Sequence, residues 1–218
     1  GGEKIEGPIL DIDHQSFVGY YPIPIRYGMT IGELAKMIVG EKWIRAIPEL
    51  DVIEMSGWDR SMYFDDTGLT WVKPSPNIPD IETAIIYSGM CLVEGTNISE
   101  GRGTDHPFKY IGAPWMAEEV CMDLQGMKKL IGVEFIKQKF RPRSIKGVVN
   151  SPKYDGKSCI GFKVRVKDRA QYNSVLVGVQ ALYTTRNLTP WKLQLKQEHL
   201  NRLWGNDKLT KVLNDKLA

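Results

Sequence analysis

The eight residues 160–167 read IGFKVRVK, so apolar side chains alternate with glycine or a cation. A period of two residues is typical of an antiparallel strand that buries one face and exposes the other. Residues 132–140 predict another strand before it, and residues 174–186 predict a helix after it. Two short helices, near residues 199–204 and 207–217, are expected to close the chain. The inner face of the 174–186 helix is expected to carry Val175, Val179, Leu182 and Tyr183.

Capping signals mark two helices in the first half of the chain. Thr30 and Glu33 have the spacing of a capping box, which predicts a helix over residues 31–39. Asp80 is a suitable N-cap for a second helix. A third helix is predicted over residues 117–130. We expect the buried face of the second helix to carry Ile81, Ala84, Ile85, Ser88, Cys91 and Leu92.

The remainder of the first half predicts little regular structure. Residues 1–28 are extended and rich in turns, because their prolines forbid helix. Residues 50–55 predict a strand, and two long irregular stretches cover residues 56–78 and 94–107. The order of elements is neither a repeating strand–helix–strand pattern nor an all-strand one. The predicted class is therefore α+β, with mixed helices and a mostly antiparallel sheet.

The composition is that of a folded protein without a strongly charged partner. Of the 218 residues, 42% are apolar and 25% are charged, and the net charge is +3. These values exclude disorder and give little support to nucleic-acid binding. The densest basic run is better explained as a solvated strand face and turn, because no aromatic residues that could stack on bases are interleaved with it. It consists of Lys137, Lys139, Arg141, Arg143 and Lys146.

The cysteines and histidines form no metal-binding or disulfide pattern. Cys91, Cys121 and Cys159 are odd in number and far apart, and the three histidines share no ligand spacing. We expect no metal, and we expect the thiols of Cys91 and Cys121 to be buried. No apolar run is long enough to cross a membrane, so no membrane span is predicted.

Residues 94–107 carry the densest set of polar groups in the chain, among them Glu94, Glu100, Arg102 and three glycines. Long irregular stretches in a compact domain are usually functional, and glycines let backbone amides approach a ligand. The spacing matches neither GxxxxGK[ST] nor GxGxxG, which disfavours a nucleotide. A small polar ligand, such as a sugar, fits better. The alternative is an Ω-loop whose polar side chains satisfy its own backbone.

Several motifs, in a fixed order, resemble those of the NamZ family, which are exo-acting β-N-acetylmuramidases long catalogued as a domain of unknown function. The resemblance is specific over about residues 5–115 and looser beyond them. Its central motifs are LTWVKPSPNIP at 69–79, CLVEGTN at 91–97, SEGRGT at 99–104 and GAPW at 112–115. Upstream, GPILD at 7–11, SFVG at 16–19 and PIPIRYGMTIGEL at 22–34 fit the same pattern.

The resemblance implies a protein of two parts. Residues 1–45 would be the tail end of a Rossmann-like N-terminal domain, and residues 46–218 would form the smaller C-terminal α+β domain. The active site would lie in the cleft between them, so the partner of this chain would be the missing N-terminal domain of the same protein. The catalytic carboxylate usually proposed lies in that domain, so the resemblance does not imply that these residues are active alone.

The resemblance also implies an activity, a substrate and a compartment. Family members remove N-acetylmuramic acid from the non-reducing end of peptidoglycan fragments without a cofactor. They are usually exported, to the periplasm or the exterior of the bacterial cell, although no export signal is readable here. We therefore expect a glycoside hydrolase of cell-wall recycling.

Glycoside hydrolysis needs a carboxylic acid that protonates the leaving oxygen and a second group that acts as nucleophile or base. Glu94 and Glu100 are the candidates in this chain. Glu94 follows an apolar helix, where burial would raise its pKa toward that of a general acid. The alternative is that either glutamate accepts loop amides or pairs with Arg102, and this alternative is favoured for Glu100.

The lactyl carboxylate of N-acetylmuramic acid calls for an arginine in the site. Arg102 and Arg26 are the candidates, and a salt bridge across the domain junction is the alternative for Arg26. Among Trp58, Trp71 and Trp115, at most one is expected to stack on a sugar, and core packing is the alternative. The remaining expected substrate-binding residues are Asn77, which could instead bond its own turn, and Thr96, Asn97, Thr104 and Asp105.

Two other functions remain open at this point. One is a non-catalytic module that binds cell-wall muropeptides or sugars, which predicts saturable binding without turnover. The other is a structural domain of an assembly on an envelope surface, which predicts no sugar binding and an exposed apolar patch.

Overall fold

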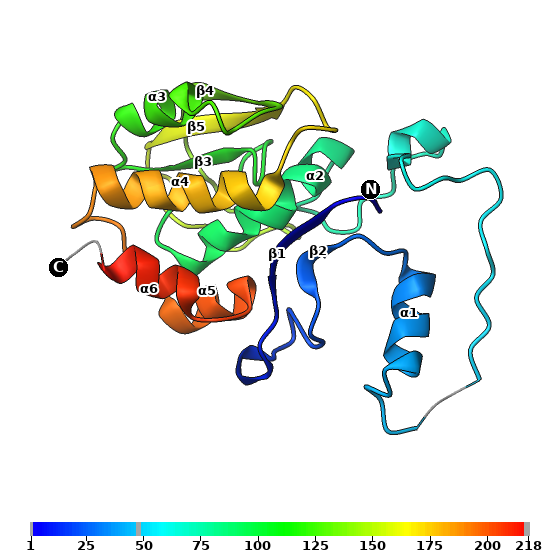
Figure 1. The fold of residues 1–218 in the computed structure, drawn as a ribbon. Helices are drawn as coiled ribbons and strands as arrows, with labels where there is room; N and C mark the ends of the chain where they lie inside the picture. The colour runs from blue at the N-terminus through cyan, green and yellow to red at the C-terminus, as the bar shows by residue number, and fades with distance from the viewer. Residues whose placement is uncertain (1, 47–48, 216–218) are drawn as a thin grey trace.

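The computed structural model describes residues 2–46 and 49–215 (Figure 1). It has the predicted α+β class, and both of its sheets are antiparallel. The smaller sheet pairs β1 (Ile5–Ile9) with β2 (Pro24–Tyr27). The larger sheet has the strand order β3–β5–β4, with bounds Tyr110–Ala113, Cys159–Val166 and Val133–Phe140.

Six α-helices and three short 3-10 turns lie in the described residues. The helices are α1 (Ile31–Gly40), α2 (Ile81–Met90), α3 (Glu119–Gly126), α4 (Ser174–Leu188), α5 (Gln197–Trp204) and α6 (Lys208–Asn214). The turns are η1 (Ile12–His14), η2 (Phe64–Thr67) and η3 (Cys91–Gly95).

The alternating segment forms β5, the central strand of the larger sheet. Phe162 and Val164 are buried, whereas Lys163 between them is partly exposed and Arg165 after them is exposed. β5 pairs with β4 along its whole length and with β3 over residues 160–163, so it is the central strand of the sheet. The prediction of a half-buried antiparallel strand is confirmed.

Helices α2 and α4 cross at a pair of glycines. A Cβ atom on Gly89 of α2 would lie 1.8 Å from the carbonyl oxygen of Ser174, and one on Gly178 of α4 would lie 2.3 Å from that of Gly89. Both helices therefore approach backbone to backbone, which no larger residue at either position allows.

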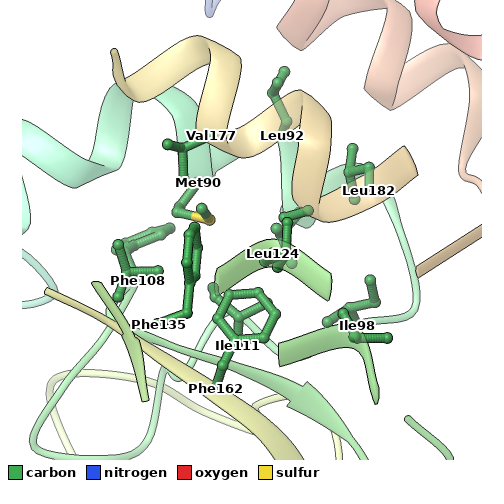
Figure 2. Close-up of a cluster of buried hydrophobic side chains, with 14 of the residues drawn as sticks. Met90, Leu92, Ile98, Phe108, Ile111, Leu124, Phe135, Phe162, Val177 and Leu182 are labelled. Atoms are coloured by element: carbon green, nitrogen blue, oxygen red, sulfur yellow. The ribbon is translucent and has the colours of Figure 1, made fainter. Parts of the chain in front are cut away.

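The hydrophobic core lies between these helices and the larger sheet. Figure 2 shows the side chains of α2, α3 and α4 pointing toward those of the strands. Phe135 and Phe162 meet edge to face with their ring centroids 5.6 Å apart. The fully buried members include Met90, Leu92, Ile98, Phe108, Ile111, Leu124, Phe162 and Leu182. All three cysteines are buried and free.

A buried ion pair ties the N-terminal sheet to α4. Glu6 of β1 is only 6% exposed; its Oε1 accepts a hydrogen bond from the guanidinium of Arg26, on β2. Its Oε2 accepts the backbone N–H of Val175 at 3.0 Å, in the first turn of α4. The negative charge at a helix N-terminus adds a favourable interaction with the helix dipole.

The capping predictions are confirmed, but four other expectations need correction. Thr30 and Glu33 form the capping box of α1, and Asp80 caps α2. Residues 50–55 form no strand, because no neighbouring strand pairs with them there. The helix expected over residues 117–130 is limited to α3, since Met127 already has extended backbone angles.

The face of α2 was also predicted wrongly. Its fully buried positions are Thr83, Ile86, Gly89 and Met90, because α4 crosses on that side. The helix ends at Met90, so Cys91 and Leu92 belong to η3. For α4, Val175 and Leu182 are buried as expected, while Val179 and Tyr183 are only partly buried. In the last helix, residues 216 and 217 lie outside the described part of the chain, and α6 ends at Asn214.

Candidate active site

The loop after α2 is pinned to the rest of the fold at several points. Thr96 pairs with Leu195 before α5, and Ser99 pairs with Gly112 of β3. Gly101 and Gly103 have positive φ angles of 76° and 80°. Their absent side chains leave room for neighbouring backbone, since a Cβ on Gly101 would lie 2.6 Å from the carbonyl oxygen of Tyr110.

Chain packing therefore accounts for glycine at both positions, and the expectation that their amides approach a ligand stays a prediction. Both Gly101 and Gly103 are buried, and a Cβ on Gly103 would lie 2.4 Å from the carbonyl oxygen of Arg143. This packing fixes Arg102 between two constrained residues, and its side chain remains 32% exposed.

Arg102 lies at the centre of a charge cluster. Its Nη2 is 3.2 Å from Oε2 of Glu94, and its Nε is 3.9 Å from Oε1 of Glu100. The guanidinium also lies 5.1 Å from the ring centroid of Phe108. Glu100 has a second cation beside it, because Nζ of Lys153 is 3.0 Å from its Oε2. Two carboxylates and two cations thus meet at the end of η3.

Burial raises the pKa of Glu94, and the nearby Glu100 carboxylate adds to this effect, while the charges of Arg102 and Lys153 oppose it. The Glu94 side chain is 19% exposed, so solvent still reaches it. Burial also raises the pKa of Tyr87 to about 12, with smaller contributions from Cys91 and Glu94. The phenol is therefore protonated at neutral pH and able to donate a hydrogen bond.

The sequence reasoning missed Lys153. It lies on the segment between β4 and β5, and no motif or composition signal distinguishes it from the other lysines. Only the tertiary fold brings its ammonium group to Glu100. Tyr87 was missed as well, although it is an aromatic residue seven positions before Glu94.

Most of the other polar side chains of the loop are engaged in its own structure. The hydroxyl of Thr96 is fully buried, donates to the carbonyl of Val93 at 2.8 Å and accepts the N–H of Ile98 at 3.0 Å. Thr104 donates to the carbonyl of Gly101 at 2.7 Å. For both residues the structure favours the loop-bracing alternative over ligand binding.

Asn97 and Asp105 differ in their surroundings. The amide of Asn97 donates to the carbonyl of Lys192 at 2.9 Å and accepts the N–H of Gln194 at 3.0 Å, so it joins the loop to the segment before α5. Asp105 is exposed. It remains accessible to a ligand, and its role stays a prediction.

The two expected residues outside the loop lie in other surroundings. Arg26 forms a salt bridge with Glu6, but both residues lie within residues 1–45, so this pair does not cross the expected domain junction; the described contacts of Arg26 do not include Glu94 or Arg102. The backbone N–H of Asn77 donates to the hydroxyl of Ser75 at 3.3 Å, within the turn that leads to α2. The role of each in substrate binding stays a prediction.

The three tryptophans of interest have protein contacts. Trp71 packs against Phe64 and the core. The indole of Trp115 donates to the hydroxyl of Tyr154 at 2.8 Å. The guanidinium of Arg60 lies 5.9 Å from the ring of Trp58. Core packing accounts for Trp71 and Trp115.

A cavity of about 390 Å³ lies between the N-terminal segment, α2 and α5, and none of the four charged residues of the cluster lines it. Tyr87 connects the cavity to the cluster indirectly: it lines the cavity and makes an edge contact with Phe108, 4.7 Å between centroids, and Phe108 in turn contacts the guanidinium of Arg102. Aromatic walls with a few polar groups are typical of small-molecule sites. The aromatic and charged lining residues are Phe17, Tyr20, Tyr21, Tyr27, Tyr87, Arg202 and Trp204. Within the described residues, no cluster of three or more His, Cys, Asp or Glu side chains is placed to hold a metal ion.

Comparison with known families matches nearly the whole chain. A model described as exo-β-N-acetylmuramidase NamZ, N-terminal, matches residues 1–82, and one described as exo-β-N-acetylmuramidase NamZ, C-terminal, matches residues 85–218. The chain belongs to the NamZ family. The two NamZ regions meet at the start of α2, and the cavity is lined from both of them. The expected boundary between residues 45 and 46 stays a prediction.

Individual relatives agree with the family. The peptidoglycan β-N-acetylmuramidase NamZ of Bacillus subtilis (strain 168) is 41% identical over 216 residues, which are 98% of this chain but 50% of that protein. The chain therefore spans about half the length of this relative. Two crystal structures of DUF1343 family proteins from Bacteroides fragilis NCTC 9343 superpose with TM-scores of 0.89 and 0.76, at 26% and 30% identity. They cover 100% and 98% of this chain, which in turn covers 57% and 55% of them.

No helix of the described residues has the length and apolar character needed to cross a membrane.

Proposed function

We propose that the full-length protein is an exo-acting glycoside hydrolase that removes N-acetylmuramic acid from the non-reducing end of peptidoglycan fragments. The family membership and the activity in the name of the Bacillus subtilis relative support this proposal. The structural observation that carries it is the partly exposed Glu94–Arg102 pair, with an aromatic-lined cavity that Tyr87 and Phe108 connect to it. An aromatic wall with a nearby carboxylic acid and a cation suits an anionic sugar.

Glu94 is the group of this chain that we assign to proton transfer. Burial raises its pKa, which is the direction that a general acid needs before it protonates the leaving oxygen. Glu100 is 5% exposed and lies between Arg102 and Lys153, so we assign it to holding these cations in place. The second catalytic group would then come from the part of the protein that this chain does not include.

Arg102 is the group that we assign to recognition of the lactyl carboxylate. A guanidinium has five donors in a planar fork, so it can bind a second carboxylate while it keeps Glu94. The burial of Phe108 beneath it and the two constrained glycines on either side hold it in place. N-acetylglucosamine lacks the lactyl group and would not receive this interaction.

We also propose that the protein is exported, since its substrate polymer lies outside the cytoplasmic membrane. Secretion of the full-length protein by its native host, measured by fractionation, tests this point separately from the activity. Recovery of the native protein only from the cytoplasmic fraction would contradict export.

The activity is tested with the full-length protein and a chromogenic β-N-acetylmuramide. We expect release of N-acetylmuramic acid and a loss of about 10²-fold in kcat/KM for Arg102→Ala, because a charge-assisted contact to substrate is removed. Arg141→Ala, which changes an exposed arginine, is the matched control. If the intact protein releases no N-acetylmuramic acid from any muramide, the proposed hydrolase is wrong. Saturable binding without turnover would favour the cell-wall binding module instead.

A further inference from the structure

Lys153 has an unusual set of partners for a lysine. Its ammonium group donates to the backbone carbonyl oxygens of Val93 at 3.1 Å, Glu94 at 3.4 Å and Ile98 at 2.8 Å. It also lies 3.0 Å from Oε2 of Glu100. An ammonium has three N–H donors, and four oxygens surround this one, so its hydrogen-bonding capacity is used within the protein. The side chain is 21% exposed.

The next residue contacts the same loop. The hydroxyl of Tyr154 donates to the carbonyl of Asn97 at 2.7 Å and accepts the indole N–H of Trp115 at 2.8 Å. Two consecutive side chains therefore bind four carbonyl groups of the loop over residues 93–98. Without them, these partly buried carbonyls would each lose a donor, which costs free energy, although that of Val93 would keep the donors of Thr96.

The backbone of this segment adopts a conformation that side chains disfavour. Ser151 and Tyr154 have φ angles of 50° and 60°, in the left-handed region, and Gly156 follows at 74°. Such conformations cost on the order of 1 kcal/mol or more for each non-glycine residue, and persist when surrounding contacts fix them. Here Asp155 fixes the segment, because its carboxylate accepts the hydroxyl of Ser144 at 2.6 Å.

We propose that Lys153 is a positioning residue of the muramidase site: through three carbonyls and Glu100, its ammonium group fixes the loop that carries Glu94 and Arg102. This inference rests on the proposed function. Lys153 touches neither the sugar nor the reacting atoms in this role; it acts through the residues that do.

The charges explain what the removal of Lys153 would change. Glu100 would keep only Arg102, now 3.9 Å away, and this guanidinium would move toward Glu100 and away from Glu94. Glu94 would then lose two cations. The other ionisable groups that act on this region are Tyr87 and Cys91 beside Glu94, and Lys196 and His199 of the α5 region beside Lys153.

The test compares four forms of the full-length protein: wild type, Lys153→Met, Lys153→Arg, and Lys157→Met as the matched control. Lys157 is an exposed lysine of the same segment. For Lys153→Met we expect a fall of about 10²-fold in kcat with a much smaller change in KM, because the loop no longer holds its groups in place. The pH at which activity falls on the basic side should rise, since Glu94 loses nearby positive charge.

Lys153→Arg keeps the positive charge. The pH at which its activity falls on the basic side (the basic limb of the pH profile) should match that of the wild type, and part of kcat should be restored. Hydrogen exchange gives a readout that does not depend on turnover. The amides of residues 94–104 should exchange faster in Lys153→Met than in wild type, while those of β5 keep their protection. If Lys153→Met does not fold, Lys153→Gln replaces it, because its amide retains two donors.

The outcomes separate the two proposals. Wild-type protein without muramidase activity would refute the proposed function, and loop exchange would still decide the role of Lys153. If the wild type is active and Lys153→Met matches Lys157→Met in kcat, basic limb and loop exchange, the positioning role is wrong. An equal loss of kcat in Lys153→Met and Lys157→Met would also overturn the positioning role, because it would show a general effect of removing a positive charge.

Discussion

Replacement of Glu6 by glutamine should lower the free energy of unfolding by about 3 kcal/mol at neutral pH. The Glu6 side chain is 3% exposed and that of Arg26 is 14% exposed, so both charges of this pair lie mostly out of water. The same carboxylate accepts the N–H of Val175 at the start of α4. The substitution leaves the guanidinium without an anion and the helix N-terminus with a neutral acceptor.

The magnitude follows from these contacts. Loss of one partner of a buried ion pair costs about 3 to 5 kcal/mol, mostly because the remaining charge is buried and unpaired. The residual exposure of Arg26 lets some water reach the guanidinium, which moves the expectation to the lower end. The helix-dipole contribution of about 0.5 kcal/mol adds to the cost, and the remaining amide oxygen recovers a similar amount.

The assay is urea unfolding of the full-length protein followed by tryptophan fluorescence at pH 7, with Glu3→Gln as the control. Glu3 is exposed, so its variant should match the wild type. The double variant Glu6→Leu with Arg26→Met should lose less than either single variant, because it leaves no unpaired charge. A cost below about 1 kcal/mol for Glu6→Gln, or a double variant that loses the full sum, would refute the reasoning.

Two further predictions concern the site and the helix crossing. The first substitution is Glu94→Gln. In the wild type, burial holds the pKa of Glu94 in the folded state above the ordinary value of 4.5. The stability contributed by the bound proton is fully present below that value and is lost as the pH rises through the folded-state pKa. The melting temperature of the variant relative to wild type should therefore rise from pH 4 to pH 7 while muramidase activity is lost, and a pH-independent difference would contradict the assignment. Gly89→Ala should cost about 3 kcal/mol or more of unfolding free energy, since the new methyl group would overlap the carbonyl of Ser174. Gly126→Ala, at the open end of α3, should be neutral or stabilising by about 0.5 kcal/mol, and equal thermal stability of the two alanine variants would show that α2 and α4 can separate without cost.

The elements that the sequence predicted well are those whose signals are local. Thr30 and Glu33 recognise each other within one helical turn, and β5 shows its buried face in its own alternation. Residues 50–55 have a similar local pattern but form no strand, because a strand also needs a partner and none is supplied by the described residues. For α2, apolar residues occur on more than one side, so the pattern could not say which side would meet α4.

The same distinction applies to the candidate site. Glu94 and Arg102 lie eight residues apart on one loop, and their proximity could be anticipated from the glycines around them. Lys153 reaches this loop from 59 residues beyond Glu94, after β4 has formed and the chain has turned back toward β5. Its role depends on the assembled sheet, which no local signal encodes. Thr96 and Thr104 have hydroxyl groups suited to sugar binding, and the sequence therefore indicated them as ligand contacts. In the structure, both hydroxyls donate to backbone carbonyls of their own loop.

The three buried cysteines have a consequence for the redox environment that the protein tolerates. Burial raises the pKa of Cys91 to about 12 and that of Cys159 to about 11, and it also raises the pKa of Cys121. At pH 7, fewer than about one thiol in 10⁴ of the first two is then the reactive thiolate. The folded chain should thus survive an oxidising exterior without a disulfide. The thiols are most open to oxidation in the unfolded state, so if the protein is exported as proposed, the speed of folding would set the risk of wrong pairing.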